Sequence, residues 1–407
     1  MARSGEIIGA LDLGSSKIAC LIFETGRGGG GARILGVGHQ RSRGLKSGTV
    51  VDANAAELAI RAAVAQAERA ASVTLSDVYV AITCGRLASV SFAAHGQITG
   101  VAIREGDIAR VFDGARAYAE QNNRVLVHMN RKAFRLDGVI GGDDPRGMAA
   151  AKLSADMHVV TADEGAIRNV LHVVERCHLS VAGLVAAPYA SALAVTSEDE
   201  RRLGVTVIDM GGGTTTVACF SEEQFRHCEV LATGGHHLTF DIAQNLRAPL
   251  AEAERIKALY ASMVNAKSDV SDRFFYAATG ESDGELRQLT RAQLADVVGL
   301  RIECLLQEVG SRVRAAGLDG HPVVLTGGAS QLAGLAASAS RFFEAPVRLG
   351  RPQSLPGLVA GADNPAFAAA VGLGLVVFDG VPATLDGASG AAIGYMGRVK
   401  RWIGSGF

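Results

Sequence analysis

Three glycine-rich segments of the chain combine a flexible backbone with acidic, hydroxyl and basic side chains. They read LDLGSSK, IDMGGGTTT and VLTGGASQL. Their glycine and polar residues are Asp12, Gly14, Ser15, Ser16 and Lys17; Asp209, Gly211, Gly212, Gly213, Thr214 and Thr215; and Gly327 and Gly328. The first two segments lie between β-rich runs, and the third joins a β-rich run to a helical one, so each is expected at a turn.

These residue types suit the binding of a nucleoside triphosphate with magnesium. Glycine lets backbone N–H groups approach a phosphate closely, and consecutive N–H groups in a turn form a concave anion site. Asp12 and Asp209, each near a strand end, can hold Mg²⁺ through its water ligands. Two such hairpins facing each other would clamp the phosphates, and the third turn would offer backbone to the nucleoside. The sequence has no G-x-x-x-x-G-K-[ST] motif, which disfavours a P-loop NTPase.

Hydrophobic periodicity predicts an α/β fold with a repeated strand hairpin. Strands are expected at 6–14, 17–25 and 32–40, a second strand hairpin at 204–220, and helices at 52–71, 249–262 and 289–318. Residues 86–163 alternate strands with one helix in a different texture, which indicates a small α+β insertion.

Composition excludes several classes of protein. The chain has 407 residues, of which 48% are hydrophobic and 20% charged, and its net charge of −1 offers no basic field for nucleic acid. The six cysteines are scattered without a C-x-x-C pair, as expected for reduced thiols in a cytoplasmic protein. No uncharged apolar run approaches the ~20 residues that span a bilayer, so any membrane contact is expected to be peripheral.

The three segments resemble the phosphate 1, phosphate 2 and adenosine motifs of the actin/Hsp70/hexokinase superfamily. Within it, nearly the whole chain is similar to the bacterial cell-division FtsA family. The segments that carry the similarity are GLKSGTVVD, VYVAITCGRL, DPRGMAAAKLSADMHVVTA, LGVTVIDMGGGTT, GGHHLTFDIAQNLRAPLAEAERIK and VVLTGGASQLAGL. The resemblance implies an α/β, two-lobed actin-like ATPase fold with an inserted small α+β subdomain (1C) and a C-terminal amphipathic helix.

The resemblance also implies a division of the chain into subdomains. The expected parts are 1A at 1–85, 164–203 and again at 367–380; 1C at 86–163; 2A at 204–241 and 306–366; 2B at 242–305; a flexible linker at 381–392; and a membrane-targeting helix at 393–407.

Further site residues follow from the same resemblance. Asp12 and Asp209 resemble the acidic residues near magnesium, and the two glycine turns resemble the phosphate cradles. Glu254 and Lys257 resemble the pair that reaches ribose and adenine, and their i,i+3 spacing puts them on one helix face; a surface ion pair is the alternative. Arg291 and Arg301 lie in the region that receives the acidic C-terminal peptide of FtsZ in this family, and solvated surface arginines are the alternative. The other site residues that the resemblance implies are those of the three glycine-rich segments given in the first paragraph.

One position departs from the superfamily pattern. Many of these ATPases carry Glu or Gln just before the proline of the connecting helix, where it positions the attacking water. Here the segment VAAPYASAL has Ala187 before Pro188. Because alanine cannot orient water, we expect ATP binding with weak or absent hydrolysis.

The C-terminal segment GAAIGYMGRVKRWIGSGF has helical apolar spacing. On a helix, Tyr395, Met396, Val399, Trp402 and Ile403 form one stripe, while Arg398, Lys400 and Arg401 lie off its centre and Phe407 adds an apolar end. This composition is typical of a helix that lies in an anionic membrane surface. A helix docked on the protein's own surface is the alternative.

The resemblance therefore implies an ATP- and Mg²⁺-binding, self-assembling protein that tethers FtsZ filaments to the cytoplasmic face of the cell inner membrane. It also implies that the protein recruits later division proteins to the septum, whereas the absence of nucleic-acid binding is expected from the net charge. Two alternatives share the motifs: a pilus-assembly adaptor and a sugar kinase, which would need a catalytic aspartate and a polar sugar pocket. An Hsp70-type chaperone would need a substrate-binding β-domain, for which too few residues follow Phe378.

Overall fold

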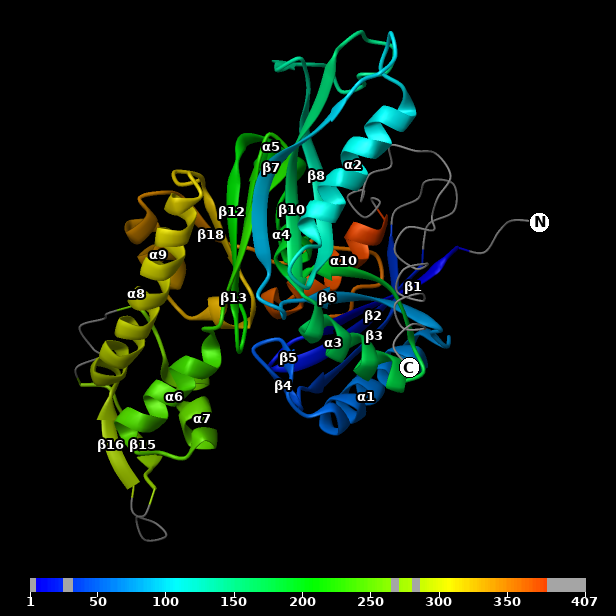
Figure 1. Cartoon of the computed structure of the whole chain (residues 1–407). Helices are drawn as coiled ribbons and strands as arrows, with labels where there is room; N and C mark the ends of the chain where they lie inside the picture. Colours follow the sequence, from blue (N-terminus) through cyan, green and yellow to red (C-terminus); the bar gives the residue numbers. More distant parts are fainter. Residues whose placement is uncertain (1–4, 25–31, 265–270, 280–285, 379–407) are drawn as a thin grey trace.

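The computed structural model describes residues 5–24, 32–264, 271–279 and 286–378. These residues form two lobes, each built on a five-stranded sheet, and a smaller sheet is inserted in the first lobe (Figure 1). The predicted linker at 381–392 and the predicted membrane helix at 393–407 lie outside the described residues. Within the described residues, no helix has the length and apolarity needed to cross a bilayer.

The two large sheets repeat one topology. In the first lobe the order is β11-β6-β1-β2-β3, and in the second it is β14-β13-β12-β17-β18. Each has three antiparallel strands followed by two parallel ones. The strands are β1 (Ile7–Leu13), β2 (Lys17–Glu24), β3 (Arg33–Arg41), β6 (Asp77–Ile82), β11 (Ser180–Ala186), β12 (Val205–Met210), β13 (Thr215–Ser221), β14 (Gln224–Leu231), β17 (Val323–Thr326) and β18 (Val347–Leu349). The repeated hairpin predicted from the sequence is therefore present.

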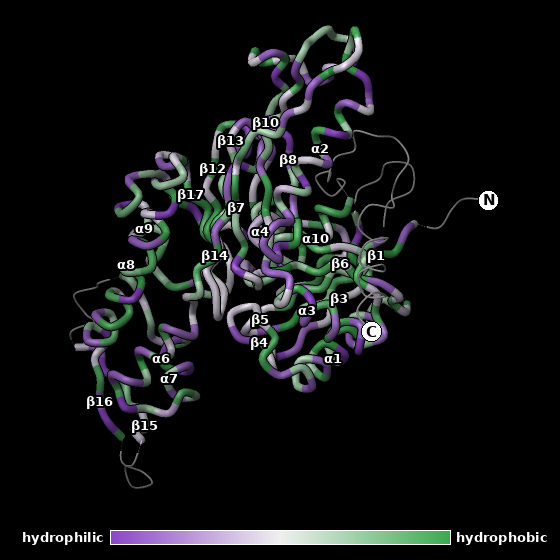
Figure 2. Tube along the Cα trace, viewed as in Figure 1, coloured by the Kyte–Doolittle hydropathy of each residue, from purple (hydrophilic) through white to green (hydrophobic). Residues whose placement is uncertain are grey.

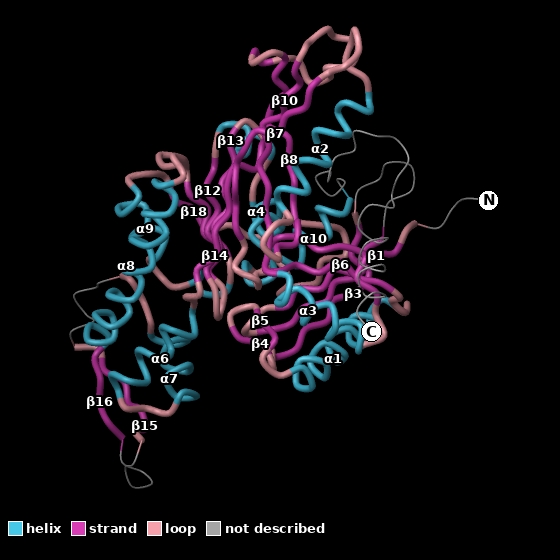
Figure 3. The backbone as a smooth tube through the Cα atoms, in the orientation of Figure 1, coloured by secondary structure: helices cyan, strands magenta, loops and turns pink. Residues whose placement is uncertain are grey.

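Helices cover both faces of the first sheet (Figure 3). Helices α1 (Ala53–Ala71) and α3 (Glu164–Arg176) pack on one face, and α4 (Ala187–Val195) and α10 (Ala368–Phe378) on the other. Strand β2 is consequently buried along its length, and Figure 2 shows this sheet as mainly hydrophobic. Asp52 caps α1 by accepting from the N–H groups of Asn54 and Ala55.

The insertion is a separate sheet with one helix. Its order is β7-β10-β8-β9, and α2 packs across β7, β8 and β10. The elements are β7 (Ala88–Gln97), α2 (Glu105–Ala119), β8 (Arg124–Leu136), β9 (Val139–Ile140) and β10 (Lys152–Asp163). The insertion has its own hydrophobic core, which includes Phe112, Phe134 and Met157, and is therefore a separate subdomain.

The remaining elements complete the second lobe and the connections. They are β4 (Leu45–Lys46), β5 (Thr49–Val50), α5 (Glu198–Leu203), α6 (Gly235–Leu246), α7 (Leu250–Tyr260), β15 (Arg273–Ala277), β16 (Leu286–Thr290), α8 (Arg291–Ala315), η3 (Gly328–Gln331), α9 (Leu335–Phe343) and η4 (Pro365–Phe367).

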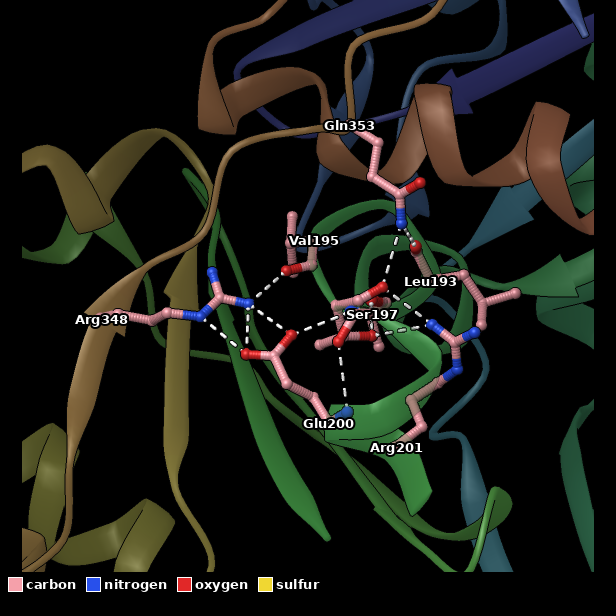
Figure 4. A network of polar contacts seen from close by, with 9 residues as sticks. Leu193, Val195, Ser197, Glu200, Arg201, Arg348 and Gln353 are labelled. Atoms are coloured by element: carbon pink, nitrogen blue, oxygen red, sulfur yellow. Dashed lines mark hydrogen bonds and ion pairs between the residues drawn. The ribbon is translucent and has the colours of Figure 1, made fainter. Parts of the chain in front are cut away.

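Polar contacts hold together the two places where the chain passes between the lobes (Figure 4). Arg348 at the end of the second sheet donates to both carboxylate oxygens of Glu200 at 2.8 Å and to Val195 O at 2.7 Å. Gln353, on the return path, donates to Thr196 O at 3.0 Å. These hydrogen bonds join the two connecting segments, residues 195–200 and 348–353, to each other.

Two buried histidines lie where the insertion meets the lobes. His128 Nε2 on β8 accepts from the N–H of Ala186 at 2.9 Å, and His158 Nε2 on β10 lies 2.7 Å from Ser89 Oγ. Both rings pack against Phe225 of β14. Burial lowers the pKa of His128 to about 4, and burial together with the nearby cationic groups lowers the pKa of His158 to about 3.

These shifts predict a loss of stability in mild acid. In the unfolded chain histidine protonates near pH ~6.5, whereas the folded protein keeps both rings neutral to about pH 4, so the unfolded state binds more protons between these values. Stability is therefore full above pH ~6.5 and falls by up to about 1.4 kcal/mol per pH unit for each ring below it. Urea unfolding measured across this range should show a smaller pH slope for His128→Gln and for His158→Gln. The exposed-site control His95→Gln should keep the wild-type slope, and equal slopes in all four proteins would contradict the assignment.

Candidate functional site

The two glycine turns predicted to cradle phosphates lie against each other between the lobes. The turn after β1 and the turn after β12 are joined through the β4–β5 turn: Gly48 N–H donates to Ser15 Oγ at 3.1 Å, and Ser47 Oγ donates to Gly213 O at 3.1 Å. A Cβ on Gly213 would lie 2.6 Å from Ser15 Oγ, and one on Gly212 would lie 2.8 Å from Ser16 Cβ. Glycine is therefore required at 212 and 213 because the two turns lie too close together for a side chain.

The third glycine turn meets the same place. β17 runs parallel to β12, with Thr326 beside Asp209. Gly327 follows with φ of +86°, and a Cβ there would lie 2.3 Å from Asp209 Oδ1. Gly328 begins the short helix η3. The tertiary structure thus brings together all three segments, which are separated by more than a hundred residues in the sequence.

Two carboxyl groups and one ammonium group are buried under these turns. Burial raises the pKa of Asp12 to about 6, although the Lys17 ammonium opposes the shift. Burial and the charge of Asp12 raise the pKa of Asp209 to about 6, against a hydrogen bond from Ser191. Burial lowers the pKa of Lys17 to about 8, and its ammonium donates to Ala366 O and lies 3.6 Å from the centre of the Phe367 ring.

The donor set fits a hard divalent cation with phosphate. Carboxylates are the ligands Mg²⁺ prefers, and it keeps several waters, so Asp12 and Asp209 suffice as its protein contacts. The described residues include no group of three or more metal-ligating side chains, so most ligands would come from water and phosphate. The buried hydroxyl of Thr215 has no hydrogen-bond partner within the described part of the chain, which leaves a donor for an anion at the second turn.

Helix α6 begins at the second turn, and the predicted Glu254–Lys257 pair of α7 contacts its first residue. Gly235 N–H donates to Gly211 O at 2.9 Å, and His236 N–H donates to Gly212 O at 2.7 Å. Lys257 Nζ on α7 lies 2.7 Å from Glu254 Oε2 and donates to Gly235 O at 3.1 Å.

The same pair is also fixed from the side. Thr239 Oγ1 on α6 accepts from Lys257 Nζ at 2.8 Å and donates to Glu254 Oε2 at 2.5 Å. The pair is thus anchored at the cleft by the start of α6, which a pair exposed on a lone helix would not be.

Other predicted residues take different positions. Ala187 is the buried first residue of α4, directly after the strand end of β11. Arg301 makes a two-pronged ion pair with Asp241, and Arg291 pairs with Asp272 at 2.6 Å. A peptide carboxylate would have to compete with these two aspartates, and the assignment of both arginines to a partner stays a prediction. The tail residues assigned to the membrane lie outside the described part of the chain.

Several residues of the cleft were not singled out from the sequence. Ser47 and Gly48 come from the small β4–β5 turn, Ser191 comes from α4, and Thr239 comes from α6. Each is an ordinary turn or helix residue in the sequence, and only its position beside a glycine turn or an aspartate gives it a role. The glycine pair before α6 was visible in the sequence but had no assigned purpose.

Comparison with known proteins shows the family to which the chain is related. The family description "Cell division protein FtsA" matches residues 206–372, and "SHS2 domain inserted in FTSA" matches residues 85–161. The cell division protein FtsA of Agrobacterium fabrum is 39% identical over 91% of this chain and 87% of its own length. That of Pseudomonas aeruginosa is 34% identical over 100% of this chain and 99% of its own length.

Solved structures share the fold at low sequence identity. The PilM–PilN type IV pilus biogenesis complex superposes with a TM-score of 0.65 at 18% identity, covering 91% of this chain and 98% of that one. MreB5 of Spiroplasma citri bound to AMPPNP superposes with a TM-score of 0.57 at 12% identity, covering 91% and 96%.

The two repeated sheets with their facing glycine turns define an actin-like protein, and the fold class predicted from the sequence is confirmed. The inserted sheet and the full-length identity to curated relatives narrow this class. The chain belongs to the FtsA family of cell division proteins.

Gly327 offers a test of the close packing at the site. Gly327→Ala combines a positive φ with a Cβ placed against Asp209, so we expect the free energy of unfolding to fall by about 2 kcal/mol or more. The control is Gly114→Ala in the middle of α2, where a Cβ meets nothing within 4 Å and should add up to about 1 kcal/mol of stability. Chemical unfolding of the three proteins measures the difference, and an unchanged Gly327→Ala variant would refute the packing.

Proposed function

We propose that the cleft binds ATP with Mg²⁺ and that the nucleotide controls self-assembly of the chain. The observation that carries this is the convergence of three glycine turns over Asp12 and Asp209. The first two turns would hold the phosphates, the third would face the nucleoside, and the Glu254–Lys257 pair would reach ribose and adenine. The fold neighbour MreB5 was solved with AMPPNP, and MamK was solved as a double helical filament, which supports both parts of the proposal.

The same cleft would hydrolyse ATP slowly. A hydrolase of this geometry needs a polar group to orient water, and Ala187 at the start of α4 has none. ATP would then act as a bound switch that favours one arrangement of the lobes.

The proposed role of the assembled chain is to tether FtsZ filaments to the cytoplasmic membrane and to recruit later division proteins at the septum. Support comes from membership of the FtsA family and from the sequence of the tail, whose apolar stripe and basic flanks suit a membrane surface. A short helix binds weakly alone, so assembly would strengthen the attachment through avidity. The FtsA-type insertion favours this role over that of the pilus protein with a similar fold.

Nucleotide binding can be tested on α7, where two cationic residues that are two positions apart have different partners. Lys257→Ala removes the cation at the start of α6 and should weaken ATP binding about tenfold, as expected for one charge-assisted contact. Arg255→Ala, whose guanidinium pairs with Glu252 instead, should bind ATP like the wild type. Equilibrium titration with a fluorescent ATP analogue measures both.

Hydrolysis is tested in the same preparation. Phosphate release by the wild type in excess Mg·ATP should stay near background. Release at about one turnover per second or faster, which is ordinary for an enzyme, would overturn the proposed role of Ala187.

The tether is tested with FtsZ and vesicles that contain anionic lipid. FtsZ should sediment with the vesicles when the full chain is present, and should stay in solution with a chain that lacks residues 393–407. Trp402→Glu, on the apolar stripe, should abolish sedimentation, whereas Ser405→Glu adds the same charge off the stripe and should reduce it far less. FtsZ that stays soluble beside the full chain would sink the tether proposal.

A further inference from the structure

A polar cavity of about 740 Å³ lies where the insertion meets the second lobe. It has no residue in common with the nucleotide cleft. Its walls are Ser89, Ser91 and Lys132 of the insertion, Ser221, Arg226, His227 and Glu229 of β13–β14, and Arg312, Ala315, Ala316 and Leu318 at the end of α8. Strand β13 begins at the glycine turn and ends at the cavity, so the two sites are about 20 Å apart along one strand.

Two β-bulges place cations in this cavity. On β8, Arg131 pairs with Met157 and Ala133 with Asp156, which leaves Lys132 as an extra residue. On β14, Phe225 pairs with Phe220 and His227 with Cys219, which leaves Arg226 as an extra residue. A bulge redirects the side chain of its extra residue, and bulges are common beside functional sites. Here two separate sheets each have a bulge at a cation that lines the same cavity.

The cavity wall carries more cationic side chains than carboxylates: Lys132, Arg226 and Arg312 face a single carboxylate, that of Glu229. Lys132 Nζ donates to Ser91 Oγ at 2.7 Å and makes no ion pair with any described residue. Arg226 pairs with the exposed Glu222 outside the cavity wall. Burial and the charge of Arg226 lower the pKa of Lys132, although the charge of Asp156 opposes the shift, so the two cations repel each other. An anion bound between the two groups would relieve this repulsion.

The one carboxylate of the wall is already engaged. Glu229 pairs with Arg312 at 3.0 Å and lies 3.6 Å from His227 Nε2, which has no hydrogen-bond partner within the described part of the chain. The wall therefore presents an ammonium, two guanidinium groups and serine hydroxyls. A guanidinium fork and an ammonium both favour phosphate oxygens, and hydroxyls add neutral donors.

We propose that this cavity is a second anion site, which binds a small phosphate-bearing ligand through Lys132, Arg226 and the serine hydroxyls. Its walls belong to two parts of the molecule that otherwise touch through few polar contacts, such as Gln224 Nε2 to Lys132 O at 3.1 Å and Cys228 N to Ser89 Oγ at 3.1 Å. A bound anion neutralises the repulsion across this junction. It therefore stabilises one orientation of the insertion relative to the second lobe.

The test is calorimetric titration of the full chain with pyrophosphate, while Mg·ADP and excess magnesium keep the nucleotide cleft occupied. We expect one binding event per chain, weakened about tenfold or more by Lys132→Gln and by Arg226→Gln. Lys152→Gln, at the far end of the insertion sheet, and Arg341→Gln, exposed on α9, should bind like the wild type. A parallel titration with glycerol phosphate distinguishes an inorganic anion from an organic phosphomonoester as the preferred ligand.

Thermal unfolding without pyrophosphate separates binding from folding. Lys132→Gln should melt at the wild-type temperature or above it, because one of two repelling charges is gone, and pyrophosphate should raise the melting temperature of the wild type but not of the variant. Absence of binding by the wild type, or equal binding by wild type, Lys132→Gln and Arg226→Gln, would overturn the proposal. Because ADP occupies the cleft throughout, failure here leaves the proposed nucleotide site untouched.

Discussion

The structure depends on how closely two hairpin turns approach each other between the lobes. Gly212 and Gly213 lie against Ser16 and Ser15 at distances that leave no room for a Cβ. This contact brings the amides of both turns to one place and sets the spacing of the lobes. It also places Asp12 and Asp209, one from each lobe, under the same turns, where burial raises the pKa of both carboxyl groups. The lobes thus meet at the place where the proposed nucleotide and Mg²⁺ would bridge them.

Around this contact, polar contacts and one strand connect the two lobes and the insertion. The chain passes between the lobes twice, and Arg348 and Gln353 hold the two crossings together. Strand β13 connects the second glycine turn with the junction of the insertion at its other end. The insertion has its own core, and it meets the lobes through His128, His158 and the polar cavity. One strand thus runs from the second glycine turn to the junction with the insertion.

Sequence reasoning was most successful where a local rule applied. The two strand hairpins and the i,i+3 pair of Glu254 and Lys257 both follow from spacing within a few residues, and the structure contains each of them. The bulges at Lys132 and Arg226 were not predicted, because a bulge depends on the register with a partner strand. The roles of Ser47, Ser191 and Thr239 were missed for a related reason, since each depends on a neighbour distant in the chain.

By itself, the sequence determined the class of fold, the three turns and the residue types that suit phosphate and magnesium. These follow from backbone freedom at glycine, from hydrophobic periodicity and from the family motifs, all of which are local properties. Only the tertiary structure decided that the turns touch, that Gly327 lies against Asp209, and that Arg291 and Arg301 are already paired. It also decided that two cations from different sheets share one cavity. Contacts of this kind depend on how separate elements pack against each other, and the spacing of residues along the chain does not predict that packing.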